Sequence, residues 1–196
     1  MKRTTLIGGG LAAGLLVSMT VPAPAFAAPV QIIPWEDSFQ TVHEVGEEDW
    51  CPPDIVDFPV AESWQGSGKT RITTQRNGII RFADTYDTVA ELSANGHTFV
   101  IESHGNVRDH KIVDNGDGTL TISFKDSTLS TAWLDGEFLF HDSGQVEGSF
   151  IVDHNGTPGF PDDDEFIGVD GEIQLHGRFD TEDRDFCEDV AEFLGD

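Results

Sequence analysis

The stretch that decides the fold class is Asp114-Asn115-Gly116-Asp117-Gly118, followed by Thr119-Leu120-Thr121-Ile122-Ser123-Phe124. Asp, Asn and Gly tolerate the backbone angles of tight turns, so the first five residues predict a turn. After the turn, the apolar residues Leu120, Ile122 and Phe124 alternate with small polar ones. Successive side chains of a strand point to opposite sides, so this alternation predicts a strand with one buried face.

The same pattern recurs on both sides of this stretch. Asn77-Gly78 and Asn95-Gly96 are typical hairpin turns. Short strands are predicted over 69–74, 79–82, 88–92, 98–102, 106–113, 146–152 and 173–179.

Many short strands joined by such turns predict an all-β fold. We expect an antiparallel β-barrel, because closure removes exposed edges and the strand glycines Gly148, Gly171 and Gly177 suit barrel corners. A β-sandwich is the alternative. Only Phe186 to Leu194 has helical spacing, which predicts one short C-terminal helix.

The chain begins like an export signal. Lys2 and Arg3 precede an uncharged apolar run from Leu6 to Val21, and Ala25-Phe26-Ala27 offers small residues at a cleavage site. The alternative is a membrane anchor, but a spanning helix needs about 20 apolar residues and this run is shorter and rich in glycine. We therefore expect secretion, with no membrane insertion after cleavage.

The predicted organisation has three parts. Residues 1–27 form the signal peptide, residues 28–49 an acidic arm or linker with six acids and no Lys or Arg, and residues 50–196 the β-barrel domain. Four apolar residues of the arm, at 35, 39, 42 and 45, are expected to be able to pin it to the domain.

The charge of the exported chain limits its partners. Cleavage removes Lys2 and Arg3 but none of the 36 acids, so the formal charge changes from −25 to −27. This balance argues against nucleic acid, whose phosphates need a basic surface. It argues equally against anionic lipid.

Cys51 and Cys187 are the only cysteines. An even number in an exported chain predicts a disulfide, which would join the start of the domain to its end.

Several stretches carry a resemblance. They are Cys51 to Val60, Asn106 to Asp109, Asp114 to Ile122, Gly148 to Gly156, Gly171 to Gly177 and Asp185-Phe186-Cys187. In this order they resemble a group of small secreted actinobacterial proteins of unknown function. The resemblance implies a β-rich exported domain with one disulfide, and it implies no catalytic residue. The acidic arm and the Asp-rich loop from Pro158 to Phe166 depart from it.

Calcium is the metal that the acidic residues favour. Oxygen ligands gather in Asp153, Asn155, Asp162, Asp163, Asp164 and Glu165, and Ca²⁺ prefers oxygen. The EF-hand spacing is absent, because Gly156 comes too early. A solvated acidic loop and a weak calcium site are both compatible with this segment, and no other cofactor is predicted.

Catalytic motifs are weak. The seven histidines, at 43, 97, 104, 110, 141, 154 and 176, form neither H-x-x-x-H nor H-E-x-x-H, and G-x-S-x-G is absent. No catalytic residue is assigned.

We therefore expect a secreted, non-enzymatic binding or surface-associated module, which can hold a small apolar ligand in the barrel. The alternatives are an extracellular hydrolase-like enzyme with its site at the barrel mouth, and a calcium-dependent binding protein.

Overall fold

The structure is a computed structural model that describes residues 30–195, and the predicted export signal lies outside these residues. It contains one antiparallel sheet, a short 3-10 helix and one α-helix. The elements are β1 (Gln31–His43), β2 (Val60–Thr74), β3 (Ile80–Ala94), β4 (His97–Asp114), β5 (Thr119–Leu134), β6 (Glu137–Asp153), η1 (Pro161–Asp163), β7 (Glu165–Val169), β8 (Gln174–Phe179) and α1 (Phe186–Leu194).

Strands that follow one another in the chain are neighbours in the sheet. The order runs from β1 to β7, and β8 pairs with the other half of the same edge of β6. Asn95 and Gly96 adopt positive φ angles of 52° and 88°, as do Asp135 and Gly136 with 50° and 86°. Such tight turns match the twist of antiparallel strands. The antiparallel all-β prediction is confirmed.

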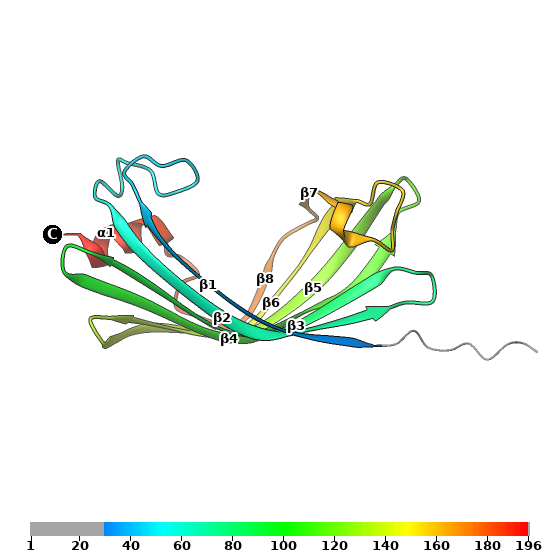
Figure 1. Ribbon diagram of the computed structural model, residues 1–196, viewed down its shortest axis with the longest axis horizontal. Helices are drawn as coiled ribbons and strands as arrows, with labels where there is room; N and C mark the ends of the chain where they lie inside the picture. Colours follow the sequence, from blue (N-terminus) through cyan, green and yellow to red (C-terminus); the bar gives the residue numbers. More distant parts are fainter. Residues whose placement is uncertain (1–29, 196) are drawn as a thin grey trace, which may run out of the picture.

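The first six strands are longer than the sequence predicted. They span 13 to 18 residues each. The predicted strands 79–82 and 88–92 both belong to β3 apart from Ile79, and 98–102 and 106–113 both belong to β4. Each long strand bends near its middle, so the sheet has two arms (Figure 1). We call the inner side of this bend the concave face and the outer side the convex face.

A row of residues rich in glycine crosses the sheet at the bend, and we call it the crease. Each member lies opposite the next one on the neighbouring strand. The row is Trp35, Gly68, Tyr86, Gly105, Thr128, Gly144 and Gly177.

Aromatic rings fill the space that these glycines leave. A Cβ atom on Gly105 would lie 2.6 Å from the Tyr86 hydroxyl and 2.7 Å from the Ser127 carbonyl oxygen. The Trp35 ring occupies the equivalent place over Gly68. Aromatic side chains that cover glycines in this way support a strongly curved sheet.

Two hydrophobic cores lie on the concave face, one on each arm. In the first core, Val190 and Leu194 of α1 are fully buried against Val60, Leu92 and Phe99. The second core is smaller and is built around Ile79, Leu120 and Val152.

The prediction of a closed barrel is wrong, because the described strands form an open sheet in which β1 pairs only with β2. The physical reason is the direction of curvature: the crease folds every strand along its length instead of rolling the sheet across its strands. The segment 44–59 and α1 lie inside one arm, and η1 lies inside the other (Figure 1). Of the three glycines assigned to barrel corners, Gly148 and Gly177 lie on the concave side of bent strands, and Gly171 lies between β7 and β8.

The predicted acidic arm contributes a strand to the sheet. Residues Gln31–His43 pair with β2 along their whole length, so this part of the arm is not a linker. The outer side of β1 has no partner strand among residues 30–195. Pro34, Glu36 and Asp37 interrupt this edge, and proline or charge on an edge strand discourages pairing with another chain.

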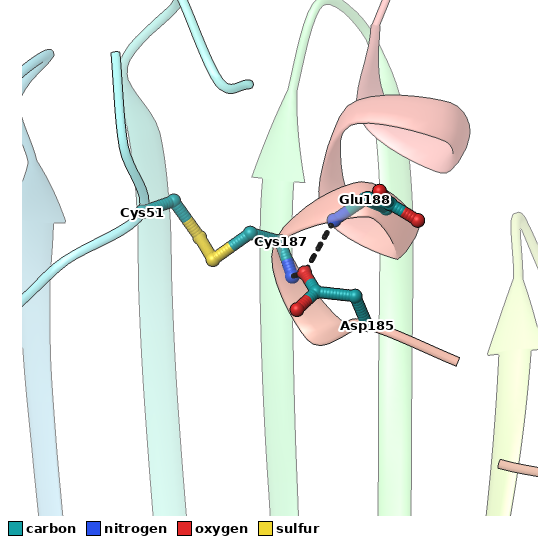
Figure 2. Close-up of a disulfide and its surroundings, with 4 residues drawn as sticks. All are labelled: Cys51, Asp185, Cys187 and Glu188. Atoms are coloured by element: carbon teal, nitrogen blue, oxygen red, sulfur yellow. Dashed lines mark hydrogen bonds between the residues drawn. A yellow bond between two sulfur atoms is a disulfide. The ribbon is translucent and has the colours of Figure 1, made fainter. Parts of the chain in front are cut away.

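The predicted disulfide is present. Cys51 and Cys187 are joined across 136 positions of the chain, and the bond attaches α1 to the segment before β2 (Figure 2). The carboxylate of Asp185 accepts hydrogen bonds from the backbone N–H groups of Cys187 and Glu188 at 2.9 and 3.1 Å, which caps the helix. The predicted helix Phe186–Leu194 is confirmed.

Substituting a crease glycine should destabilise the fold. We expect Gly105→Ala to lower the free energy of unfolding by about 1–3 kcal/mol, because the new methyl group has no free space. Gly168→Ala in β7 is the control, since its Cβ would meet no atom within 4 Å. Urea denaturation of both variants tests this, and equal stability of the two would contradict the role of the crease.

Removing the disulfide should also destabilise the protein. We expect Cys51→Ala/Cys187→Ala to lose about 2–5 kcal/mol of unfolding free energy, because the unfolded chain then regains the freedom of a long loop. Thermal denaturation of the wild type with and without reductant should show the same direction. An unchanged melting temperature on complete reduction would refute this expectation.

Candidate binding face

The convex face carries a trough of about 640 Å³ that crosses β1 to β5. Each strand supplies two side chains spaced two apart, which places them on the same side of the sheet. They are Glu36 and Ser38, Gln65 and Ser67, Asp87 and Val89, Glu102 and His104, and Leu129 and Thr131.

The trough is acidic and mixed in polarity. Its polar groups are carboxylates, hydroxyls and amides, and apolar atoms, including those of Val89 and Leu129, line about as much of it. His104 Nδ1 lies 2.5 Å from Asp87 Oδ1, but both side chains are 70% exposed. The pair is therefore largely hydrated, and the trough is better suited to polar contacts than to proton transfer.

Basic side chains gather beside the trough on the same convex face. Of the nine Lys and Arg residues between positions 30 and 195, seven occupy convex positions of the strands. Six of them lie on β2 to β5, and we call these six the basic stripe. They are Lys69, Arg71, Arg81, Arg108, Lys111 and Lys125.

The stripe places like charges next to each other. Arg108 lies directly opposite Lys125, and Arg71 and Arg108 flank Ala83 from its two sides. Like charges opposite each other destabilise a sheet. Within residues 30–195, only Lys125 of the stripe has a carboxylate at ion-pair distance, Glu147 Oε1 at 2.7 Å. The Nε atom of Arg81 is buried and lacks a hydrogen-bond partner in the described part.

A second cavity, of about 230 Å³, lies on the concave face at the second core, and we call it the apolar pocket. Its walls come from Phe82, Ile112, Leu120 and Phe150, and from Pro158 and Pro161 of the loop that contains η1. Two carboxyl groups also line it, those of Asp109 and Asp164.

Burial raises the pKa of both carboxyl groups in the apolar pocket. For Asp109, a hydrogen bond from the Phe82 N–H at 2.7 Å and the charge of Arg81 partly oppose the rise in pKa. For Asp164, the neighbouring Asp163 adds to the rise in pKa. Both side chains are partly buried, and burial disfavours the charged form of each.

The predicted calcium ligands mostly serve the loop itself. Asp153 Oδ1 accepts a hydrogen bond from the Asn155 N–H, and the Thr157 hydroxyl donates to the Asp163 carboxylate. Glu165 lies opposite Asp153 in the sheet, Asp164 faces the apolar pocket and Asp162 belongs to η1. Among residues 30–195, no three His, Cys, Asp or Glu side chains converge as a metal site. The weak calcium site stays a prediction.

The most buried histidine–carboxylate pair lies away from the trough. His43 Nε2 lies 2.7 Å from Glu62 Oε2, with the two side chains 16% and 18% exposed. Its other ring nitrogen lies 3.4 Å from Glu47 Oε2, and the Trp50 ring stacks on the imidazole at 3.7 Å. Both nitrogens face carboxylates, which leaves neither for a substrate. The predicted site at a barrel mouth has no counterpart, since the sheet is open.

Sequence reasoning missed the basic stripe and the apolar pocket. The side of the sheet on which Lys69 and Arg71 lie follows from alternation within β2, but their proximity to Arg108 and Lys125 depends on strand register. The only local signal was the alternating pair Lys69-x-Arg71 in a chain with few basic residues.

Searches of protein-family models, of curated proteins and of solved structures find no match to this chain. The resemblance to secreted actinobacterial proteins stays a prediction. No helix between residues 30 and 195 has the length and apolar character needed to cross a membrane.

The partly buried carboxyl group of Asp126 is expected to make the stability of the protein depend on pH. Burial raises the pKa of its carboxyl group, while a hydrogen bond from the Tyr86 hydroxyl opposes this. A raised native pKa gives stability that is full below the ordinary carboxyl pKa of about 3.9 and is lost as the pH rises through the native pKa. Asp126→Asn cannot ionise, so its melting temperature should gain on the wild type between acidic and neutral pH.

The control has the opposite sign. Arg178 and the His141 N–H lower the pKa of Asp180, so Asp180→Asn should lose stability relative to the wild type over the same pH range. If the two variants change in the same direction, the assigned effect of burial on Asp126 is wrong.

Proposed function

We propose that this protein is an exported, non-enzymatic binding module whose convex sheet face holds an anionic partner on the basic stripe. The single observation that carries the proposal is the segregation of basic residues. In a chain with 36 acids, five of the six cations in the stripe have no carboxylate at ion-pair distance within residues 30–195. The disulfide and the predicted signal peptide support export.

The stripe can attract an anion although the chain as a whole is negative, because salt screens the charges that lie far from the stripe. At physiological ionic strength, charges further apart than about 8 Å are largely screened. The stripe spans β2 to β5, and three strand spacings cover about 14 Å. An anionic group above Arg71 and Arg108 therefore meets mainly these two cations, since Lys125 is already paired with Glu147. Arginine also suits this role, because its planar group binds sulfate, phosphate and carboxylate through paired hydrogen bonds.

The trough restricts the kind of anion that fits. The trough beside the stripe is lined by the carboxylates of Glu36, Asp87 and Glu102. These carboxylates would repel a polymer that carries negative charge along its whole length and crosses both the stripe and the trough. Hydroxyl and amide groups such as those of Ser67, Gln65 and Thr131 offer hydrogen bonds there. The partner we propose bears its negative charge over the stripe and uncharged polar groups over the trough.

Two features favour binding over the enzyme alternative. The His104–Asp87 pair in the trough is exposed, and the buried His43–Glu62 pair is enclosed by Trp50 and Glu47. A general base must be able to reach the proton that it removes. The His104–Asp87 pair is accessible but not buried, and the His43–Glu62 pair is buried but not accessible. Neither pair is therefore suited to act as a general base.

A sulfated heparin disaccharide, short enough to lie over the stripe without crossing the trough, is the probe for the basic stripe. We expect calorimetry to detect saturable binding that weakens as salt is raised. Arg71→Gln/Arg108→Gln should weaken it at least tenfold, because a hydrogen bond to a charged group contributes about 1.5–3 kcal/mol. The control Arg76→Gln/Arg178→Gln removes the same charge outside the stripe, and its affinity should change less than threefold. Absent binding by the wild type, or equal losses in both variants, would overturn the proposal.

A further inference from the structure

We propose that the apolar pocket is a binding site for a small organic ammonium ion, with the apolar body of the ligand between the loop and the second core and its charge beside Asp109 and Asp164. The site lies on the concave face and does not depend on the function proposed for the basic stripe.

The size of the pocket limits the ligand. Its volume is about 230 Å³, and an apolar cavity of about 150 Å³ is enough to bind benzene. The pocket therefore has room for one six-membered ring or a short alkyl chain with a single charged group. Larger cofactors and nucleotides do not fit.

The walls and the carboxyl groups together select the class of ligand. Leu120, Ile112 and Pro161 offer apolar contact, which favours a hydrocarbon body. Asp109 and Asp164 are partly buried carboxyl groups that line the pocket, and a cation beside them offsets the cost of burying their charges. A ligand that carries a carboxylate would be repelled. A neutral hydrocarbon would add no charge to balance either acid.

The same residues disfavour a bare metal ion. Calcium takes six to eight oxygen ligands, and the pocket offers the carboxylates of only two residues among apolar side chains. Phe82 and Phe150 also line the pocket, and aromatic rings attract ammonium groups that approach their faces. An ammonium ion with an apolar body satisfies all of these contacts at once.

The charges around Asp109 leave a place for a ligand cation. Arg81 is near enough to lower the pKa of Asp109, but no ion pair joins the two side chains within residues 30–195. Asp84 adds negative charge, and one of its carboxylate oxygens is buried without a hydrogen-bond partner in this part of the chain. Asp109 thus lies near a second carboxylate and one arginine, and Asp164 lies near Asp163, His154 and Asp153.

Titration with benzylammonium, followed by amide chemical shifts in NMR, tests the site on the complete exported chain. Benzyl alcohol is the neutral probe of nearly the same shape, and methylammonium is the charged probe without an apolar body. We expect benzylammonium to shift the amides of Ile112, Leu120 and Phe150 saturably and to bind at least tenfold tighter than benzyl alcohol. Methylammonium should produce no saturable shift at these positions.

Variants identify the groups that hold the charge. Asp109→Asn keeps an oxygen that accepts the Phe82 N–H, and Asp164 has no side-chain hydrogen bond within residues 30–195, so both variants should fold. Each should weaken benzylammonium at least threefold, and Asp109→Asn/Asp164→Asn should abolish its advantage over benzyl alcohol. The control Asp126→Asn removes a partly buried carboxylate outside the pocket and should leave the affinity unchanged.

Several outcomes would overturn the site. They are equal binding of benzylammonium and benzyl alcohol, saturable shifts located only on the convex face, and an equal effect of the Asp126 and Asp109 variants. Failure of the basic stripe is separable, because Arg71→Gln/Arg108→Gln leaves every residue that lines the apolar pocket in place.

Discussion

The close contact between glycines and aromatic rings at the crease is the constraint on which the rest of the structure depends. Where Tyr86 covers Gly105 and Trp35 covers Gly68, no Cβ separates ring from backbone, and long strands can bend without losing their ladder. The bend creates two arms with separate cores. It also leaves the outer side of the sheet uncovered, so the features that we assign to binding follow from the shape that the crease imposes.

The two sides of the sheet divide the chemistry between them. Nearly all apolar side chains of the cores face inward, where α1 and the loop around η1 cover them. The strands place their Lys and Arg residues outward, and no carboxylate of the described residues lies at ion-pair distance from Arg71 or Arg108. A chain with such an excess of acid can still gather most of its Lys and Arg residues on one face of the sheet, because strand alternation sorts side chains by face and not by net charge.

Some of this structure could be predicted from the sequence. Asn95-Gly96 determines its turn locally, and Asp185 with the spacing of Phe186 to Leu194 determines the helix, because capping and periodicity act within a few residues. The disulfide followed from the presence of two cysteines in a chain with a predicted export signal. The predicted strands 98–102 and 106–113 leave out Gly105, because glycine ends strands as readily as it bends them. Polar and apolar residues alternate in the same way along the strands of open and closed sheets, so this pattern does not distinguish an open sheet from a barrel. The basic stripe and the apolar pocket both depend on register between distant residues.

The position of the sulfur bridge makes the two arms unequal. It secures only the arm that carries α1, whereas the opposite arm relies on the small group around Ile79, Leu120 and Val152. Partial opening of a protein begins where the fewest apolar contacts must separate. Solvent should therefore reach the amides beside η1 and β7 while those beneath α1 remain protected. Unfolding would proceed from the arm without the disulfide toward the crease. The apolar pocket would then be lost before α1 detaches.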